Sequence, residues 1–166
     1  MSEDVIEYKQ LIDNDPTLSK NDLSEFYEKF SRDCEKSNTE GYCNDDMGED
    51  LNGSAKDIFK KLIRNINELI RYNGIYNEKY INKLCIYLKY WFYDKILTKN
   101  IDYSNIGNFF DALSQYKGED TSESKTCEFY QLKLTEIKDI KKLYDYFMFF
   151  DGYNSVKSTI NDKNIQ

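Results

Sequence analysis

The segment from residue 80 to residue 96 constrains the fold most, because it is apolar around almost the whole circumference of a helix. Its apolar side chains recur at helical spacing and leave no wide polar face: Tyr80, Ile81, Leu84, Cys85, Tyr87, Leu88, Trp91, Phe92 and Ile96. A helix that is hydrophobic all round is stable only when other elements surround it. The sequence therefore predicts a central helix, with Asn77 as its N-cap.

The rest of the chain supplies the helices that would surround it. Apolar residues at steps of three and four predict further helices. Asn21 or Asp22 is expected to cap the helix that begins near residue 21, Ser54 the helix that begins near residue 54, and Thr135 the last helix. Their expected ranges are about 21–36, 54–74, 104–116 and 135–150, with a short helix at 4–13. No stretch alternates with a period of two, and the only proline is Pro16. The predicted fold class is all-α, an irregular bundle of about five to seven helices around a central aromatic-rich helix.

The length of 166 residues fits one domain. Residues 1–20 are expected to form a partly ordered N-terminal segment, and residues 21–152 the helical domain. Residues 153–166 are expected to be a tail that is a frayed helix or disordered.

Four cysteines, Cys34, Cys43, Cys85 and Cys127, allow three disulfide pairings. Cys34 and Cys43 flank a polar loop and Cys127 follows a polar run, whereas buried thiols usually lie on apolar faces. This favours disulfides over reduced thiols, which stay the alternative. Because short loops close most easily, we favour Cys34–Cys43 together with Cys85–Cys127. The bundle is then disulfide-stabilised.

Catalytic chemistry has little support in this sequence. The chain has no histidine, which removes the commonest general base and metal ligand. The cysteine spacings do not match a zinc site, the acidic loop 44–50 does not match an EF-hand, and no phosphate-binding glycine motif occurs. We therefore predict no enzyme activity, no catalytic, cofactor-binding or metal-binding residues, and no cofactor.

Charge and aromatic content favour a protein partner. The net charge of −7 repels nucleic-acid phosphates, and no apolar run is long enough for a membrane helix. Of the 15 tyrosines, several fall beside loops or at helix ends, where they suit protein interfaces. The alternative is that these rings only pack over helix ends. The candidate interaction surface comprises Tyr42, Tyr103, Tyr116 and Tyr130.

Residues 85–96 read Cys-Ile-Tyr-Leu-Lys-Tyr-Trp-Phe-Tyr-Asp-Lys-Ile, and this stretch resembles the signature helix of the PIR superfamily of Plasmodium, whose vivax branch is called VIR. It departs from that signature mainly at Phe92, where leucine is usual. Residues 59–66 and 141–147, the latter reading Lys-Lys-Leu-Tyr-Asp-Tyr-Phe, resemble the preceding and later helices of the family. The resemblance runs in order over about residues 20–155, and its motif residues look like core: Tyr87, Leu88, Trp91, Tyr93, Leu143, Tyr144 and Phe147.

The resemblance implies a variant antigen of malaria parasites that is exported to the infected erythrocyte and often displayed at its surface. It implies antigenic variation, immune evasion and a host–parasite interaction with a host protein receptor. Membrane attachment would come only through a segment absent from this chain. The alternative is an intracellular helical scaffold or interaction protein in the host-cell cytoplasm or the parasite vacuole.

Overall fold

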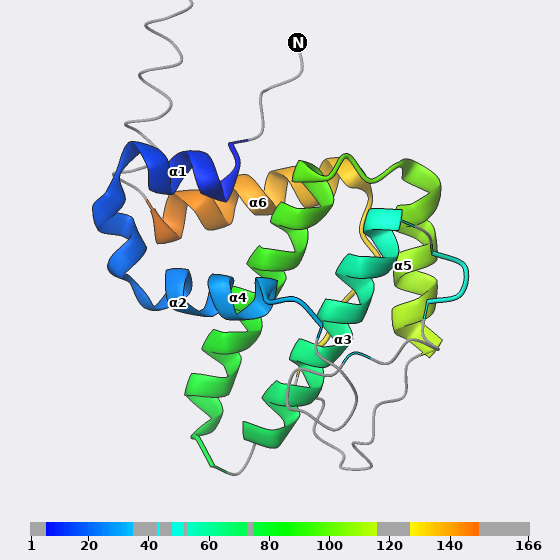
Figure 1. Ribbon diagram of the computed structural model, residues 1–166, viewed down its shortest axis with the longest axis horizontal. Helices are drawn as coiled ribbons and strands as arrows, with labels where there is room; N and C mark the ends of the chain where they lie inside the picture. The colour runs from blue at the N-terminus through cyan, green and yellow to red at the C-terminus, as the bar shows by residue number, and fades with distance from the viewer. Residues whose placement is uncertain are drawn as a thin grey trace, which may run out of the picture.

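A computed structural model of the chain describes residues 6–34, 43, 48–51, 53–72, 75–115 and 127–149. Within these ranges the chain forms six α-helices and one 3₁₀ helix and no β-strand, which confirms the all-α prediction (Figure 1). The elements are α1 (Tyr8–Asn14), the 3₁₀ helix η1 (Pro16–Lys20), α2 (Asp22–Ser31), α3 (Gly53–Tyr72), α4 (Glu78–Thr98), α5 (Tyr103–Gln115) and α6 (Leu134–Met148).

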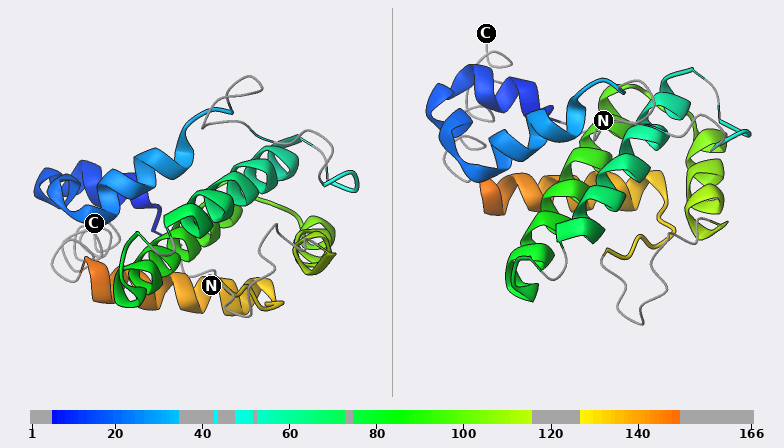
Figure 2. Two further views of the ribbon diagram at one scale, coloured as in Figure 1. Left: turned by 90° about the horizontal axis from the view of Figure 1, so that it is seen from below. Right: turned by 60° about the horizontal axis from the view of Figure 1, so that its bottom comes forward.

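Helix α4 is the centre of the bundle, as its all-round apolar sequence predicts. It packs against α2, α3 and α6, and it runs between them in Figures 1 and 2. Trp91 contacts Phe30 of α2 with ring centroids 6.3 Å apart, and Phe92 contacts Phe109 of α5 at 5.6 Å. All four rings are at most 3% exposed, so the aromatic side chains supply much of the apolar area removed from water.

Two predicted helix caps are confirmed. The Asn21 Oδ1 atom accepts a hydrogen bond from the backbone N–H of Ser24 at 2.9 Å. The Asn77 Oδ1 atom likewise accepts from the N–H of Tyr80 at 2.8 Å. Each asparagine thus accepts from a backbone N–H of the first helical turn, where the N–H groups have no acceptor within the helix.

Two other predicted caps are wrong. Thr135 lies inside α6, whose N-cap is Lys133, because Glu136 folds back and accepts the Lys133 N–H at 3.1 Å. Ser54 lies inside α3, which begins one residue earlier at Gly53. Gly53 has a φ of 52°, a left-handed value that glycine adopts without steric strain.

Helix α2 ends at Ser31 and not near residue 36, because a distant arginine binds the carbonyl groups that follow. The Arg64 guanidinium is buried and donates to the carbonyl oxygens of Phe30 at 2.9 Å, Arg32 at 2.7 Å and Asp33 at 3.2 Å. These carbonyls therefore turn toward α3 and do not continue the helix.

We expect Arg64→Lys to lower the free energy of unfolding by about 2 kcal/mol, because an ammonium cannot reproduce the forked donors that bind the carbonyls of Phe30, Arg32 and Asp33 together. The Phe30 carbonyl would keep only the Asn65 side-chain amide as a donor. Urea denaturation would measure the loss. Arg71→Lys, on the exposed last turn of the same helix, is the matched control and should change stability little. Equal losses in the two variants would contradict this role for Arg64.

Two disulfides cross-link the chain, one over 9 residues and one over 42 residues. Cys34 pairs with Cys43 at a Cα–Cα distance of 5.4 Å, and Cys85 pairs with Cys127 at 5.6 Å. The predicted pairing is confirmed, and no cysteine is free. The second bridge ties the first half of α4 to the segment that leads into α6.

The N-terminal helices belong to the same core. Leu11 is fully buried, and Ile6 and Tyr8 are each 6% exposed. The tail over residues 153–166 lies outside the described residues. No helix in the described part of the chain is long and apolar enough to cross a membrane.

Candidate interaction surface

The side of α6 that faces the core carries two charged residues. Ile137, Lys141, Asp145 and Phe149 recur every fourth position, and each is at most 1% exposed. A stripe at this spacing lies on one face of a helix. Helix α6 therefore turns an ammonium and a carboxylate inward.

Lys141 is satisfied on all sides. Its Nζ donates to both carboxylate oxygens of Asp145, at 2.9 and 2.8 Å, and to the carbonyl oxygen of Ile6 at 2.8 Å. It also lies 3.5 Å from the Asp94 Oδ1 atom and 4.9 Å from the centroid of the Tyr90 ring. One ammonium thus serves two buried carboxylates, an arrangement that is stable only while every partner is present.

Tyrosine hydroxyls and a backbone amide complete this network. The Tyr90 hydroxyl donates to Asp145 at 2.7 Å, and the Tyr27 hydroxyl donates to Asp94. The backbone N–H of Tyr8 also donates to Asp94, at 3.1 Å. Burial raises the pKa of the hydroxyls of Tyr27 and Tyr90, so both stay protonated donors. The network joins α2, α4 and α6 to residues 6–8.

Because Lys141 and Asp145 face the core, the opposite side of α6 exposes apolar residues to solvent. Leu143 is 52% exposed, Tyr146 46% and Phe147 73%, and the rings of Tyr146 and Phe147 meet at a centroid distance of 5.7 Å. We call these three side chains the α6 outer face. In the left view of Figure 2, α6 lies along one side of the bundle, with α4 between it and α2.

The exposure of Leu143 and Phe147 corrects the expectation that both lie in the core. The physical reason is that Lys141 and Asp145 make buried polar contacts, and these contacts decide which side of α6 faces the core. A prediction from apolar residues alone treats both charged residues as exposed. The other motif residues lie inward. Leu88, Trp91 and Tyr93 are buried, and the half-buried rings of Tyr87 and Tyr144 pack against the core.

Two of the four tyrosines proposed for the interaction surface are exposed. Tyr103, at the start of α5, is 75% exposed, and Tyr130, in the segment before α6, is 66% exposed with its hydroxyl donating to Glu128. Tyr42 and Tyr116 lie outside the described residues. Sequence reasoning missed the α6 outer face, although the i, i+4 spacing of Lys141 and Asp145 was a signal that these charges pair.

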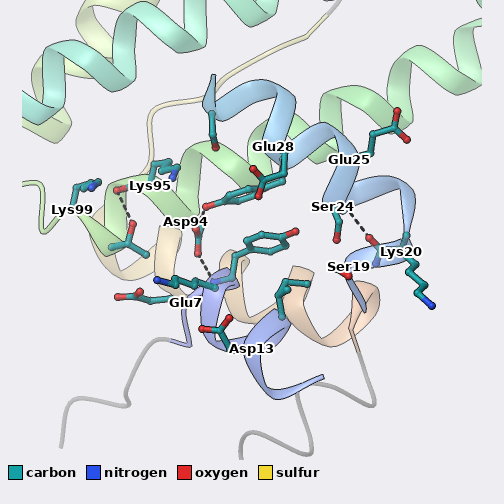
Figure 3. Close-up of a pocket in the computed structure, with 17 residues that line it drawn as sticks. Glu7, Asp13, Ser19, Lys20, Ser24, Glu25, Glu28, Asp94, Lys95 and Lys99 are labelled. Carbon is teal, nitrogen blue, oxygen red and sulfur yellow. Dashed lines mark hydrogen bonds between the residues drawn. The ribbon is translucent and has the colours of Figure 1, made fainter. Parts of the chain in front are cut away.

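A cavity of about 710 Å³ lies between α1, η1, α2 and the end of α4 (Figure 3). Asp94 and Tyr27 are among its lining residues, so it borders the buried charge network. No group of three or more potential metal ligands occurs among the residues that the structure describes.

The fold and its surface define a disulfide-stabilised, all-helical domain with an aromatic face on one outer helix. The chain belongs to the Plasmodium vivax Vir protein family, whose model matches residues 21–166. This confirms the resemblance seen in the motifs, and Vir proteins are variant Plasmodium antigens exported to the host cell. No curated protein and no solved structure matches the chain.

Proposed function

We propose that this domain is displayed on the infected red cell, binds a host protein through the α6 outer face without catalysing a reaction, and serves immune evasion by antigenic variation. The single observation that carries the binding role is the orientation of α6. The helix buries an ammonium and a carboxylate while Leu143 and Phe147 stay exposed. Family membership supports the antigen role.

The α6 outer face has the character of a binding hot spot. Aromatic side chains carry much of the energy in protein interfaces, and neighbouring rings bury a large apolar area when a partner covers them. Glu136 and Asp139 are exposed on the same side of α6, one to two turns before the apolar residues. A partner that presents an apolar patch beside basic groups would match this surface in shape and charge.

The two disulfides support an outward-facing location. Disulfides form and persist in oxidising compartments, whereas cytosolic thiols are usually kept reduced. The alternative function, an intracellular scaffold in the host cytoplasm or parasite vacuole, would place Cys34–Cys43 and Cys85–Cys127 in a less favourable setting.

We expect the double variant Leu143→Ser/Phe147→Ser to weaken binding to its host protein by about tenfold or more, because truncated hot-spot side chains lose about 1–2 kcal/mol each. The measurement is surface plasmon resonance of the domain against a panel of red-cell and endothelial surface proteins, followed by the variant against each protein that binds. Its free energy of unfolding should change by less than about 0.5 kcal/mol, since both side chains are exposed.

Ile75→Ser is the matched control, because Ile75 is also 73% exposed but lies in the turn between α3 and α4. It should leave binding unchanged. If the α6 variant binds every host protein as tightly as the unmodified domain, the α6 outer face is not the contact surface. If no panel protein binds the unmodified domain, the host-receptor role fails and the scaffold alternative gains support.

A further inference from the structure

The cavity beside the charge network has the size and composition of a ligand site. Its volume of about 710 Å³ falls in the range of small-molecule pockets. Three separate segments line it: α1 with η1, α2, and the last turns of α4. Figure 3 shows Lys95, Lys99 and Glu7 on one side and Lys20 and Glu25 on the other.

Two stacked tyrosines, Tyr8 and Tyr27, form one wall of the cavity, and their side chains are 6% and 7% exposed. The rings of Tyr8 and Tyr27 lie 3.8 Å apart between centroids, with an interplanar angle of 19°. The Tyr27 hydroxyl and the Tyr8 backbone N–H both donate to Asp94, which also pairs with Lys141. Asp94 therefore fixes the wall, and its oxygens are already occupied by groups of the protein.

Lys95 is the unusual charge in this cavity. Its ammonium is half-buried, 5.2 Å from the centroid of the Tyr27 ring, and no carboxylate of the described residues lies within ion-pair distance of it. Burial lowers the pKa of the Lys95 ammonium, Asp94 offsets part of that shift, and the charge of Lys99 lowers the pKa further. The Lys95 ammonium is thus partly desolvated, and Lys99 carries a like charge one helical turn away. An anion placed between these two ammonium groups would stabilise both charges.

We propose that the cavity binds a small aromatic monoanion. Its anionic group lies between the ammonium groups of Lys95 and Lys99, and its planar body lies against Ile12 and the Tyr8–Tyr27 wall. Besides Asp94, the carboxylates of Glu7, Asp13, Glu25 and Glu28 line the cavity and disfavour a second negative charge on the ligand. Glu7 lies on the same side as Lys95 and Lys99 in Figure 3, and the charge of Glu28 raises the pKa of the Lys95 ammonium. The site is separate from the α6 outer face, and it does not depend on a host protein.

The probes that test this proposal are benzoate, benzamidine and inorganic phosphate, titrated against the oxidised chain by isothermal calorimetry and by NMR. Benzoate should bind saturably, with a dissociation constant on the order of 1 mM or tighter. Benzamidine, which has a similar shape and the opposite charge, should bind at least about tenfold more weakly, as should phosphate, which lacks the planar body. Tighter binding of benzamidine or phosphate than of benzoate, or no saturation by benzoate, would overturn the proposal.

Variants locate the anion within the cavity. Lys95→Gln should weaken benzoate binding by about tenfold and Lys99→Gln by a smaller factor, whereas Lys95→Arg should retain binding within about threefold. Lys20→Gln removes the same charge from the opposite side of the same cavity and should have little effect. Equal losses for Lys20→Gln and Lys95→Gln would show a general charge effect and would refute the assigned position. Near-UV circular dichroism checks that each variant is folded. Because Lys99 is exposed, Lys99→Gln tests the site even if Lys95→Gln unfolds the domain.

Discussion

Replacing Lys141 with methionine is expected to lower the free energy of unfolding by about 3–5 kcal/mol, because two buried carboxylates would lose the ammonium they share. Asp94 and Asp145 are 2% and 1% exposed, so water cannot replace the missing partner. The carbonyl oxygen of Ile6 would lose its donor as well. Urea denaturation followed by circular dichroism would measure the change, since a loss of this size is a large part of a domain's stability.

The matched control for this variant is Lys138→Met, on the same helix. Lys138 is half-buried, and its replacement should change stability by less than about 0.5 kcal/mol. If both lysine variants lost the same small amount, the buried network would not be the device that holds α6 in its orientation.

The destabilisation by Lys141→Met should also depend on pH. Burial raises the pKa of the Asp145 carboxyl, and Lys141 counteracts part of that rise. A raised folded-state pKa means that this carboxyl favours folding below its ordinary pKa and loses that contribution as pH rises through the folded value. Without Lys141 the folded-state pKa of Asp145 rises further. The stability difference between the unmodified domain and the variant should therefore narrow as pH falls from 7 toward about 4, and a constant difference would contradict this account.

The part of the fold that follows from local pattern could be predicted from the sequence. The central position of α4 follows from a helix that has no polar face, and the Asn21 and Asn77 caps follow from side chains that reach only three residues along the chain. The end of α2 could not be predicted in this way. It depends on Arg64, which lies more than 30 residues from the carbonyls it binds and which a sequence pattern treats as a surface residue.

The orientation of α6 shows the same limit more strongly. Counting apolar residues places Leu143 and Phe147 inward, because the count treats Lys141 and Asp145 as solvent-exposed. Those charges are buried only because Asp94 and the backbone of residue 6 reach them from distant parts of the chain. The candidate binding surface thus depends on contacts between segments up to 135 residues apart, and no local pattern encodes them.

The two disulfides should contribute unequally to stability. Replacing Cys85 and Cys127 with alanine is expected to lower the free energy of unfolding by about 4 kcal/mol, and replacing Cys34 and Cys43 by about 3 kcal/mol. The reason is the size of the loop that each bridge closes in the unfolded chain, with sequence separations of 42 and 9 residues. The longer loop restricts more conformations of the unfolded state.

Urea denaturation of both double variants under non-reducing conditions would measure these losses, and a free-thiol count on the unmodified domain, expected to be zero, would be the control. The order of the two losses is the discriminating result. If removing Cys34–Cys43 costs more, then loop closure in the unfolded chain is not the main contribution of that bridge. The Cys34–Cys43 bridge would then act in the folded domain, by holding the carbonyls of Arg32 and Asp33 against Arg64. In that case a variant that combines Arg64→Lys with removal of this bridge should lose less free energy of unfolding than the two separate losses added together.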